Sequence, residues 1–297
     1  MVSGDASVSK TFLTLPTDGH RGFHDTVVHN ESIMTLSSNT NPSNGLTIEE
    51  VLQVYLSAWN ATINHLRPLS VTSFEEAGEN GDKVIKINQD SRSRGCIPPK
   101  TSTERETAYK KLDQCDMFCW VMYETLSEHL QRIKKTYDRC FLEIFANRPT
   151  LEYDANVCWA VFTPRPVSTF AIEGSPIASR HSVLHILTND DRSIIFDGTV
   201  EQFGWEASKA ISSLEDFSAQ CTLDGDGKDE SCRARLRDYY IKFADGGYWC
   251  EAIPGLLELL RGTDWDSLAV MPAEARAEAI RSDADARAQN VADRLWG

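Results

Sequence analysis

The run from His181 to Trp205, HSVLHILTNDDRSIIFDGTVEQFGW, is the feature that excludes the most folds for this chain. The stretch from His181 to Leu187 is predicted to be a strand, in which alternate side chains share a face, so that His181, Val183, His185 and Leu187 point the same way. The polar NDDR segment at 189–192 predicts a loop, and the chain then returns as a second strand that reaches Asp197. We therefore expect an antiparallel hairpin that ends on an aspartate.

Two registers of this hairpin both bring a histidine and a carboxylate to one face. A loop centred on Asn189 sets His181 opposite Asp197, whereas a loop centred one residue later sets position 183 opposite Asp197 and leaves His181 diagonal to it. A carboxylate beside a neutral imidazole fixes its tautomer and stabilises the imidazolium, so the pair can act as a general base. The alternative is a surface hairpin in which Asp197 caps the turn through Gly198.

Helical patterns precede the strands. Residues 1–45 are rich in Ser, Thr, Asn, Asp and Gly and show no periodicity, which predicts a disordered or loosely docked arm. The capping box at 47–50 begins an amphipathic helix that Pro68 ends. The pattern at 103–137 is helical, and a break near 113–116 is allowed because aspartate often caps helices.

The rest of the chain divides into a core and a helical region. Alternation at 82–89 and a β-rich run at 157–162 predict further strands, so an α+β core over 46–205 is expected. Residues 206–297 are mostly helical and are expected to pack on that core. Small residues along 273–295 form a seam that allows close packing, either on the protein itself or on a partner helix in self-association.

Composition excludes several classes of function. The chain has 44 acidic and 30 basic residues, a formal charge of −14 and no basic patch, so nucleic acid is not an expected partner. No segment has the roughly 20 apolar residues of a membrane span or the pattern of a signal peptide, which favours a cytoplasmic protein without membrane partners. Its eight cysteines lack a CxxC pair and are dispersed, so we expect reduced thiols and no metal site.

A family resemblance rests on the hairpin. The run His-x15-Asp-Gly-Thr-x2-Gln-Phe, from His181 through Asp197, resembles the His strand and Asp strand of the papain-like and transglutaminase-like superfamily of cysteine enzymes, with Gly198 at a position where members often carry Pro. It also resembles a stretch of uncharacterised proteins of filamentous fungi, which implies no function. The superfamily resemblance implies an α+β fold whose papain/transglutaminase-like core is a helix followed by antiparallel strands, with additional N- and C-terminal helices.

The resemblance also implies a nucleophilic cysteine near the start of an upstream helix, where the dipole and an ion-paired histidine lower the thiol pKa. Cys119 is the expected nucleophile, since Cys119-Trp120-Val121 is similar to the sequence that follows the nucleophile in those families. A helix start at Asp116 would place Cys119 in the first turn. The alternative is a core residue, because Cys119 also belongs to a helical stripe of apolar residues.

Other residues are candidates for the site, but their positions in the sequence fit the family pattern less well. Cys158 is followed by Trp but lies in a strand and close in sequence to the histidine, so a buried hydrophobe is preferred. Cys96, beside two prolines, is the third choice for the nucleophile. Gln114 lies one residue short of where papain-like enzymes carry an oxyanion-hole Gln. His185 would face Ser193 or Ile195 rather than a carboxylate, which favours a packed strand histidine.

Together these expectations describe thiol-dependent acyl transfer or hydrolysis. Cys119 would attack an amide, ester or thioester carbonyl, His181 would take and return the proton, and Asp197 would orient the imidazole. No cofactor or metal is required, and the partner would be a small-molecule or peptide acyl substrate. Two alternatives remain: a catalytically silent fold of the same type that serves as a binding or scaffold module, and a regulator recruited through residues 1–45.

Overall fold

The structure is a computed structural model that describes residues 45–78, 83–140, 155–172, 175–176, 180–224, 228–229 and 244–297. The predicted arm at 1–45 lies outside the described residues except for its last position. Residues 43–297 form one compact unit that combines helices with two β-sheets, so the predicted α+β class is confirmed.

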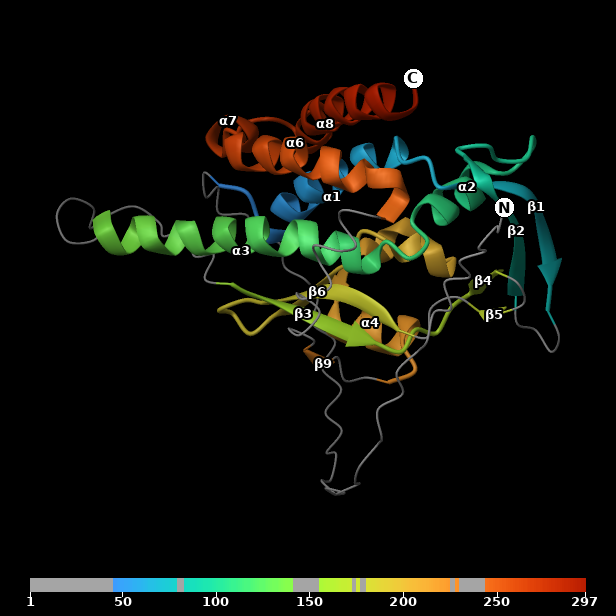
Figure 1. The fold of residues 1–297 in the computed structure, drawn as a ribbon. Coiled ribbons are helices and arrows are strands. Elements are labelled where there is room, and N and C mark those ends of the chain that lie inside the picture. The colour runs from blue at the N-terminus through green and yellow to red at the C-terminus, as the bar shows by residue number, and fades with distance from the viewer. Residues whose placement is uncertain are drawn as a thin grey trace, which may run out of the picture. The chain divides into compact units, whose positions relative to one another are not determined.

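Helix α1 (Ile48–Asn64) is buried along most of its circumference. Its start is the predicted capping box, in which Thr47 Oγ1 accepts from the Glu50 amide at 3.2 Å and the Glu50 carboxylate accepts from the Thr47 amide at 2.8 Å. The helix ends at the C-cap His65, shortly before Pro68. It contacts α2, α6 and α8 and the edge of the larger sheet (Figure 1). The apolar residues of α1 form a broad stripe that these neighbours cover, while Gln53 and Asn64 stay exposed.

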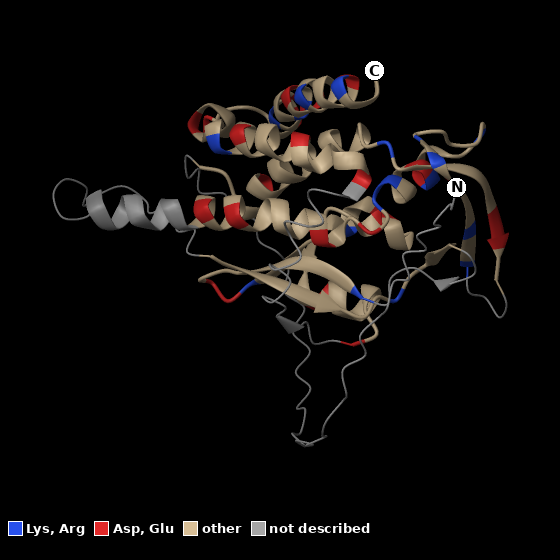
Figure 2. Ribbon diagram, in the orientation of Figure 1, with Lys and Arg blue, Asp and Glu red and all other residues tan. Residues whose placement is uncertain are grey.

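The larger sheet contains the predicted hairpin. Its strand order is β8 (Ile211–Ser213), β7 (Ser193–Phe196), β6 (His181–Leu187), β3 (Asn156–Phe162) and β9 (Lys228–Asp229), and all neighbouring pairs are antiparallel. Strands β3 and β6 contain no charged residue apart from histidine (Figure 2). Helices cover both faces of this sheet, which explains why the strands are apolar on both sides.

The two faces of the sheet pack against different helices. The Phe196 ring meets that of Phe118 in helix α3 (Cys115–Cys140) at 5.0 Å between centroids. The Phe162 ring meets that of Phe217 in helix α4 (Leu214–Cys221) at 5.4 Å. Because His181 pairs with Phe162 across β3 and β6, its side chain belongs to the α4 face.

A smaller sheet packs on helix α2 (Thr103–Lys110). Its order is β1 (Leu69–Ala77), β2 (Lys83–Arg94), β4 (Ser168–Ile172) and β5 (Ser175–Pro176), with β2 and β4 parallel. The predicted strand at 82–89 corresponds to the first half of β2. This sheet has its own small core, which consists of Val71, Ile85, Ile87, Ala108, Tyr109 and Phe170.

The predicted helical stretch at 103–137 is two helices, with the break between Lys110 and Cys115. Asp113, inside the break, has φ of 58° and so adopts the left-handed conformation that ends a helix. The expected break near 113–116 is therefore confirmed. It makes Cys115 the first residue of α3.

The chain after residue 205 begins within the larger sheet and then becomes helical. The 3₁₀ helix η2 (Ala207–Ala210) precedes β8 and α4, and α6 (Tyr248–Gly262), α7 (Trp265–Ala269) and α8 (Ala273–Trp296) follow. Four residues of the predicted seam in α8 are buried, and α8 packs on α1 and α6: Ile280, Ala284, Ala288 and Val291. The seam is thus used within the protein, which leaves its centre unavailable for self-association. None of the helices in the described segments is long and apolar enough to cross a bilayer.

Candidate active site

The hairpin adopts the second of the two predicted registers. Leu184 pairs with Phe196 and Ile186 with Ile194, so the loop is centred one residue after Asn189. Asp197 follows the last paired residue of β7, and its backbone amide donates to the Ala210 carbonyl at 2.8 Å. His181 therefore lies diagonal to Asp197 on the same face, and the His181 Nε2 and Asp197 Oδ2 atoms are 2.6 Å apart.

The Asp197 carboxylate accepts three hydrogen bonds from the described residues. Oδ1 accepts from the Thr199 amide at 2.8 Å and from the Thr199 hydroxyl at 2.9 Å, while Oδ2 accepts from His181 Nε2. The side chains of His181 and Asp197 are both 0% exposed. A carboxylate in this position holds the proton on Nε2 and leaves Nδ1 of a neutral His181 unprotonated. This end of the hairpin is therefore not solvent-facing, whereas the predicted cap of the turn by Asp197 is present, because Oδ1 accepts from the Thr199 amide.

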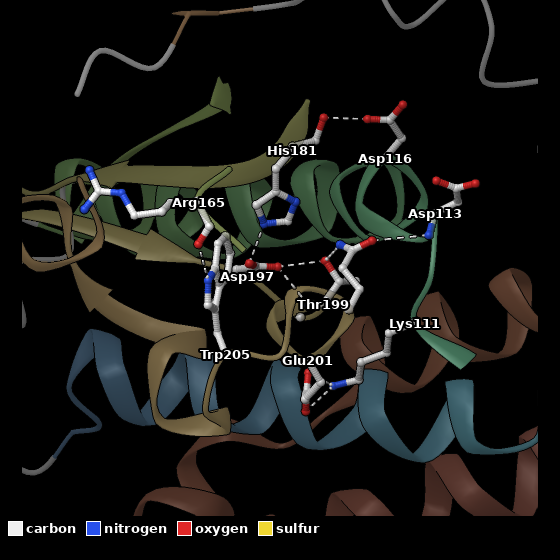
Figure 3. A network of polar contacts seen from close by, with 12 residues as sticks. Lys111, Asp113, Asp116, Arg165, His181, Asp197, Thr199, Glu201 and Trp205 are labelled. Atoms are coloured by element: carbon white, nitrogen blue, oxygen red, sulfur yellow. Dashed lines mark hydrogen bonds and ion pairs between the residues drawn. The ribbon is translucent and has the colours of Figure 1, made fainter. Parts of the chain in front are cut away.

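Aromatic rings enclose the His181 imidazole. The ring centroids of Phe203, Trp205 and Phe217 lie 4.6, 5.6 and 6.4 Å from that of His181. Trp205 is itself anchored, since its Nε1 donates to the Arg165 carbonyl at 3.0 Å (Figure 3). These rings exclude water and strengthen the hydrogen bond between the histidine and the carboxylate. Phe203 and Trp205, which follow the Asp197 turn in sequence, thus serve as packing elements.

The second ring nitrogen of His181 is unused by the described residues. Nδ1 is buried and has no hydrogen-bond partner among them. Figure 3 shows this nitrogen on the side of the ring where Asp113 and Asp116 lie. Asp113 precedes α3 by two residues, and Asp116 lies in its first turn. A buried imidazole nitrogen without a partner carries a desolvation cost that is ordinarily avoided, and such atoms are found where a protein does chemistry.

Cys115 is the cysteine at the helix start. The first helical hydrogen bond runs from the Phe118 amide to the Gln114 carbonyl at 2.8 Å, so the amides of residues 115–117 make no bond within the helix. The Ser182 backbone amide, which follows His181 directly, faces the Cys115 thiol and acts to lower its pKa. Burial raises the pKa of the Cys115 thiol, and the Asp116, Asp113 and Asp197 carboxylates raise it further. The thiol is therefore neutral at rest.

Cys119 lies one helical turn further along α3. The helix begins at Cys115 instead of Asp116, so the expectation that Cys119 occupies the first turn is wrong. Cys119 is 0% exposed and belongs to the main core, whereas Cys115 is 9% exposed. An attacking thiol has to reach the substrate. Cys115 has the larger exposed fraction of the two cysteines and is therefore favoured. The sequence allowed a break near Asp113, but that feature alone did not identify Cys115 as the first residue of α3.

The other predicted site residues lie elsewhere or have other partners. Cys158 in β3 pairs across the strands with His185, and Cys96 is exposed in the loop after β2. His185 also pairs with Ile195, as one predicted alternative had it, and burial lowers the pKa of its imidazole. Gln114 directs its Nε2 to the Asp245 carboxylate at 3.0 Å, and its Oε1 is buried without a partner in the described chain.

Asp245 is a buried carboxylate that the sequence did not indicate. It precedes α6 and has φ of 50°, and its Oδ2 accepts from Gln114 and, at 3.1 Å, from Trp249 Nε1. Burial raises the pKa of the Asp245 carboxyl above its ordinary value of 3.8 despite these two donors. Asp245 thus holds the side chain of the residue that immediately precedes Cys115.

The Tm of the Asp245→Asn variant should increase relative to that of the wild type as pH rises. A carboxyl with a raised pKa contributes stability that is present below its ordinary pKa and is lost as pH increases through the raised value. Asparagine keeps an acceptor for Gln114 or Trp249 and tolerates a positive φ, but it has no charge to bury. The Tm of the variant minus that of wild type should therefore increase from about pH 4 to about pH 7. A difference that is constant over this range would contradict the prediction.

The described residues contain no group of three or more His, Cys, Asp or Glu side chains that could hold a metal ion. Comparison with protein-family models, with curated proteins and with solved structures finds no match.

Proposed function

We propose that this protein is a thiol-dependent acyltransferase or hydrolase whose nucleophile is Cys115, with His181 as the base and Asp197 as the residue that orients it. The observation that carries the proposal is the buried His181 ring, which is bonded to Asp197 through Nε2 and has no described partner at Nδ1. The Cys115 sulfur meets the next backbone amide of the same strand, that of Ser182. The thiol and the imidazole belong to the same end of β6, with the His181 side chain on the α4 face of the sheet and α3 packed on the opposite face, so the proposal requires them to meet around the end of the strand.

The arrangement of elements supports the same proposal. A helix that begins with a cysteine packs on antiparallel strands, and neighbouring strands supply the histidine and the aspartate. This order resembles the core of papain-like and transglutaminase-like enzymes. Gly198 departs from the proline often found there, since its position admits no Cβ: one would lie 2.5 Å from the Phe118 ring.

The reaction begins with proton transfer from Cys115 Sγ to His181 Nδ1. Because the pKa of the thiol is raised at rest, the nucleophile forms only when the base accepts its proton. The thiolate attacks the carbonyl carbon of an amide, ester or thioester, and the new C–S bond gives a tetrahedral oxyanion. The amides of the first turn of α3, which have no acceptor within the helix, are the proposed donors for that oxyanion. The oxyanion collapses, the leaving group takes the proton from Nδ1, and an acyl-thioester remains on Cys115.

The second half of the reaction returns the free thiol. His181 Nδ1 takes a proton from water or from an amine, which attacks the acyl-thioester carbonyl. The C–S bond breaks, the sulfur leaves as thiolate and recovers the proton from Nδ1. Water gives hydrolysis and an amine gives transfer. The proposal includes a reducing compartment such as the cytoplasm, in keeping with Cys96, Cys115, Cys221 and Cys250 as free thiols.

Alkylation of individual cysteines tests the nucleophile. The full chain is treated with iodoacetamide between about pH 5 and pH 9, and each cysteine is quantified by peptide mass spectrometry. Exposed Cys96 and Cys250 serve as internal references for an ordinary thiol. We expect His181→Ala to slow alkylation of Cys115 at neutral pH by at least about tenfold, since the base that deprotonates the thiol is lost, and to leave the two references unchanged.

Trapping with p-nitrophenyl acetate then distinguishes the two α3 cysteines. The acetyl adduct should form on Cys115 in wild type and in Cys119→Ser, and should be lost in Cys115→Ser. An adduct that persists in Cys115→Ser and is lost in Cys119→Ser would assign the nucleophile to Cys119. If neither the alkylation nor the acetylation of either cysteine depends on His181, the catalytic proposal is wrong.

A catalytically silent fold is the second candidate, and one observation favours it. His181, Asp197 and Cys119 are all 0% exposed, so a substrate reaches the group only by way of Cys115 at 9%. In that case the pair would serve to hold β6 and β7 together beneath a binding surface. Alkylation of Cys115 at the rate of the reference cysteines, with the same pH dependence, would support this function.

A further inference from the structure

We infer that Gln202 is a positioning residue that sets the start of helix α3 relative to the pair formed by His181 and Asp197. The inference rests on the proposed function, because it assigns the device that aligns the thiol with its base. It concerns a side chain that contacts neither Cys115 nor His181. Gln202 belongs to the 3₁₀ helix η1 (Val200–Phe203), which follows the Asp197 turn.

Gln202 uses both ends of its amide to join two distant segments. Its Oε1 accepts from the Asp113 backbone amide at 3.2 Å, in the break that precedes α3. Its Nε2 donates to the Thr199 hydroxyl at 2.9 Å. That hydroxyl donates to Asp197 Oδ1 at 2.9 Å, and the other Asp197 oxygen meets His181 (Figure 3). One chain of hydrogen bonds thus runs from the loop before the cysteine helix to the imidazole.

In this chain of hydrogen bonds, the groups at the two ends determine which atom donates and which accepts in every bond. The Asp113 amide can only donate, so Gln202 presents its oxygen there and its nitrogen to Thr199. The Asp197 carboxylate can only accept, so the Thr199 hydroxyl donates to it and accepts from Gln202. The amide orientation is therefore determined by chemistry, and no other arrangement satisfies all four groups. A chain with a single allowed direction holds its members in one geometry.

The residues of this hydrogen-bond chain are buried, so water cannot easily replace their hydrogen bonds. Gln202 is 2% exposed, and Thr199 and Asp197 are each 0% exposed. The Asp113 backbone that it holds has φ of 58°, a conformation that costs an L-residue free energy and so needs a specific partner. Gln202 supplies that partner two residues before Cys115.

A second contact between the same segments provides a matched control. The Lys111 ammonium binds the Glu201 carboxylate at 2.7 Å, so the neighbouring residue of η1 also meets the break before α3. This ion pair makes no contact with Thr199 or Asp197. Glu201→Gln therefore weakens the attachment of η1 to the break but leaves the hydrogen-bond chain intact, whereas Gln202→Met removes the chain and keeps the side-chain volume.

The experiment uses two readouts on the full chain. The first is the rate of Cys115 alkylation by iodoacetamide as a function of pH. The second is the ¹⁵N chemical shift pair of the His181 ring, which reports its tautomer. We expect Gln202→Met and Thr199→Val to slow Cys115 alkylation at neutral pH about ten- to a hundredfold, the cost of a displacement of about 1 Å. Both should also populate the Nδ1–H tautomer of His181. Thr199→Ser, which keeps the hydroxyl, and Glu201→Gln should match wild type in both readouts.

The outcomes separate this inference from the proposed function. If His181→Ala slows Cys115 alkylation but Gln202→Met and Thr199→Val change neither readout, Gln202 is only a structural residue and the inference is wrong. If Gln202→Met changes the His181 tautomer while Cys115 alkylation never depends on His181, the hydrogen-bond chain stands and the catalytic proposal fails. Should Gln202→Met not fold, the comparison of Thr199→Val with Thr199→Ser decides the matter. Equal behaviour of Thr199→Ser and Thr199→Val would overturn the inference.

Discussion

Replacing Asp197 with alanine should lower the free energy of unfolding by about 3–5 kcal/mol, the usual cost of removing one partner from a fully buried hydrogen-bonded pair. The carboxylate accepts from His181 Nε2 and from the amide and hydroxyl of Thr199, and all of these groups are buried. Truncation leaves three donors without an acceptor and also opens a cavity. Equilibrium unfolding in urea measures the loss, which should appear as a lower midpoint with an unchanged slope.

Asp197→Asn separates the hydrogen bonds from the charge. Asparagine keeps an acceptor oxygen for Thr199 and nearly the same volume, so its loss of stability should be about 1–3 kcal/mol, less than that of Asp197→Ala. Its amide presents a donor to His181, which forces the proton onto Nδ1 and removes the base. A stable Asp197→Asn variant that still shows His181-dependent alkylation of Cys115 would contradict the assigned role of Asp197. Equal stability of Asp197→Ala and wild type would contradict the packing argument.

Gly198→Ala should destabilise the protein by about 3 kcal/mol, at the upper end of the usual cost of overpacking. A Cβ at this position would lie 2.5 Å from two atoms of the Phe118 ring and 2.8 Å from the Trp59 ring. Both rings are 0% exposed, and Trp59 stacks on Trp249 while Phe118 meets Phe196 edge-to-face, so neither can move aside easily. The Gly198 carbonyl also accepts from Trp59 Nε1 at 3.0 Å, and any shift of the turn weakens that bond. The change in the urea midpoint gives the cost.

Gly255→Ala is the matched control, with the opposite sign expected. Gly255 lies inside α6, and a Cβ there would have no atom within 4 Å. Alanine in a helix interior is favoured over glycine by about 0.5–1 kcal/mol, so this variant should be more stable than wild type. If Gly198→Ala were also stabilising, the close approach of the Asp197 turn to α3 would be refuted.

The local elements of this fold could be predicted because their signals lie within short stretches. The capping box at Thr47 and the strand from His181 to Leu187 each depend on a few neighbouring residues. The hairpin was limited to two registers, and both brought His181 and Asp197 to one face. The α8 seam indicated packing, but its partner could not be chosen, since that depends on where α1 lies.

The start of α3 could not be predicted because it depends on contacts from far along the chain. The helical pattern alone is continuous through the break, and a start at Asp116 was as consistent with it as a start at Cys115. The Asp113 amide is held by Gln202, which lies 89 positions away. The shift of one residue moves Cys119 beyond the first turn and puts Cys115 at the helix start. Asp245, 131 positions from Gln114, was missed for the same reason.

The packing of α1 against α8 has a consequence for how the protein is made. Arg276 and Asp285 of α8 bind Glu50 and His65 at the two ends of α1, across 226 and 220 positions of sequence. During translation α1 emerges early, and its apolar surface stays uncovered until α8 has left the ribosome. Such late closure of a core exposes the nascent chain to aggregation, so α1 is the segment on which a chaperone would act.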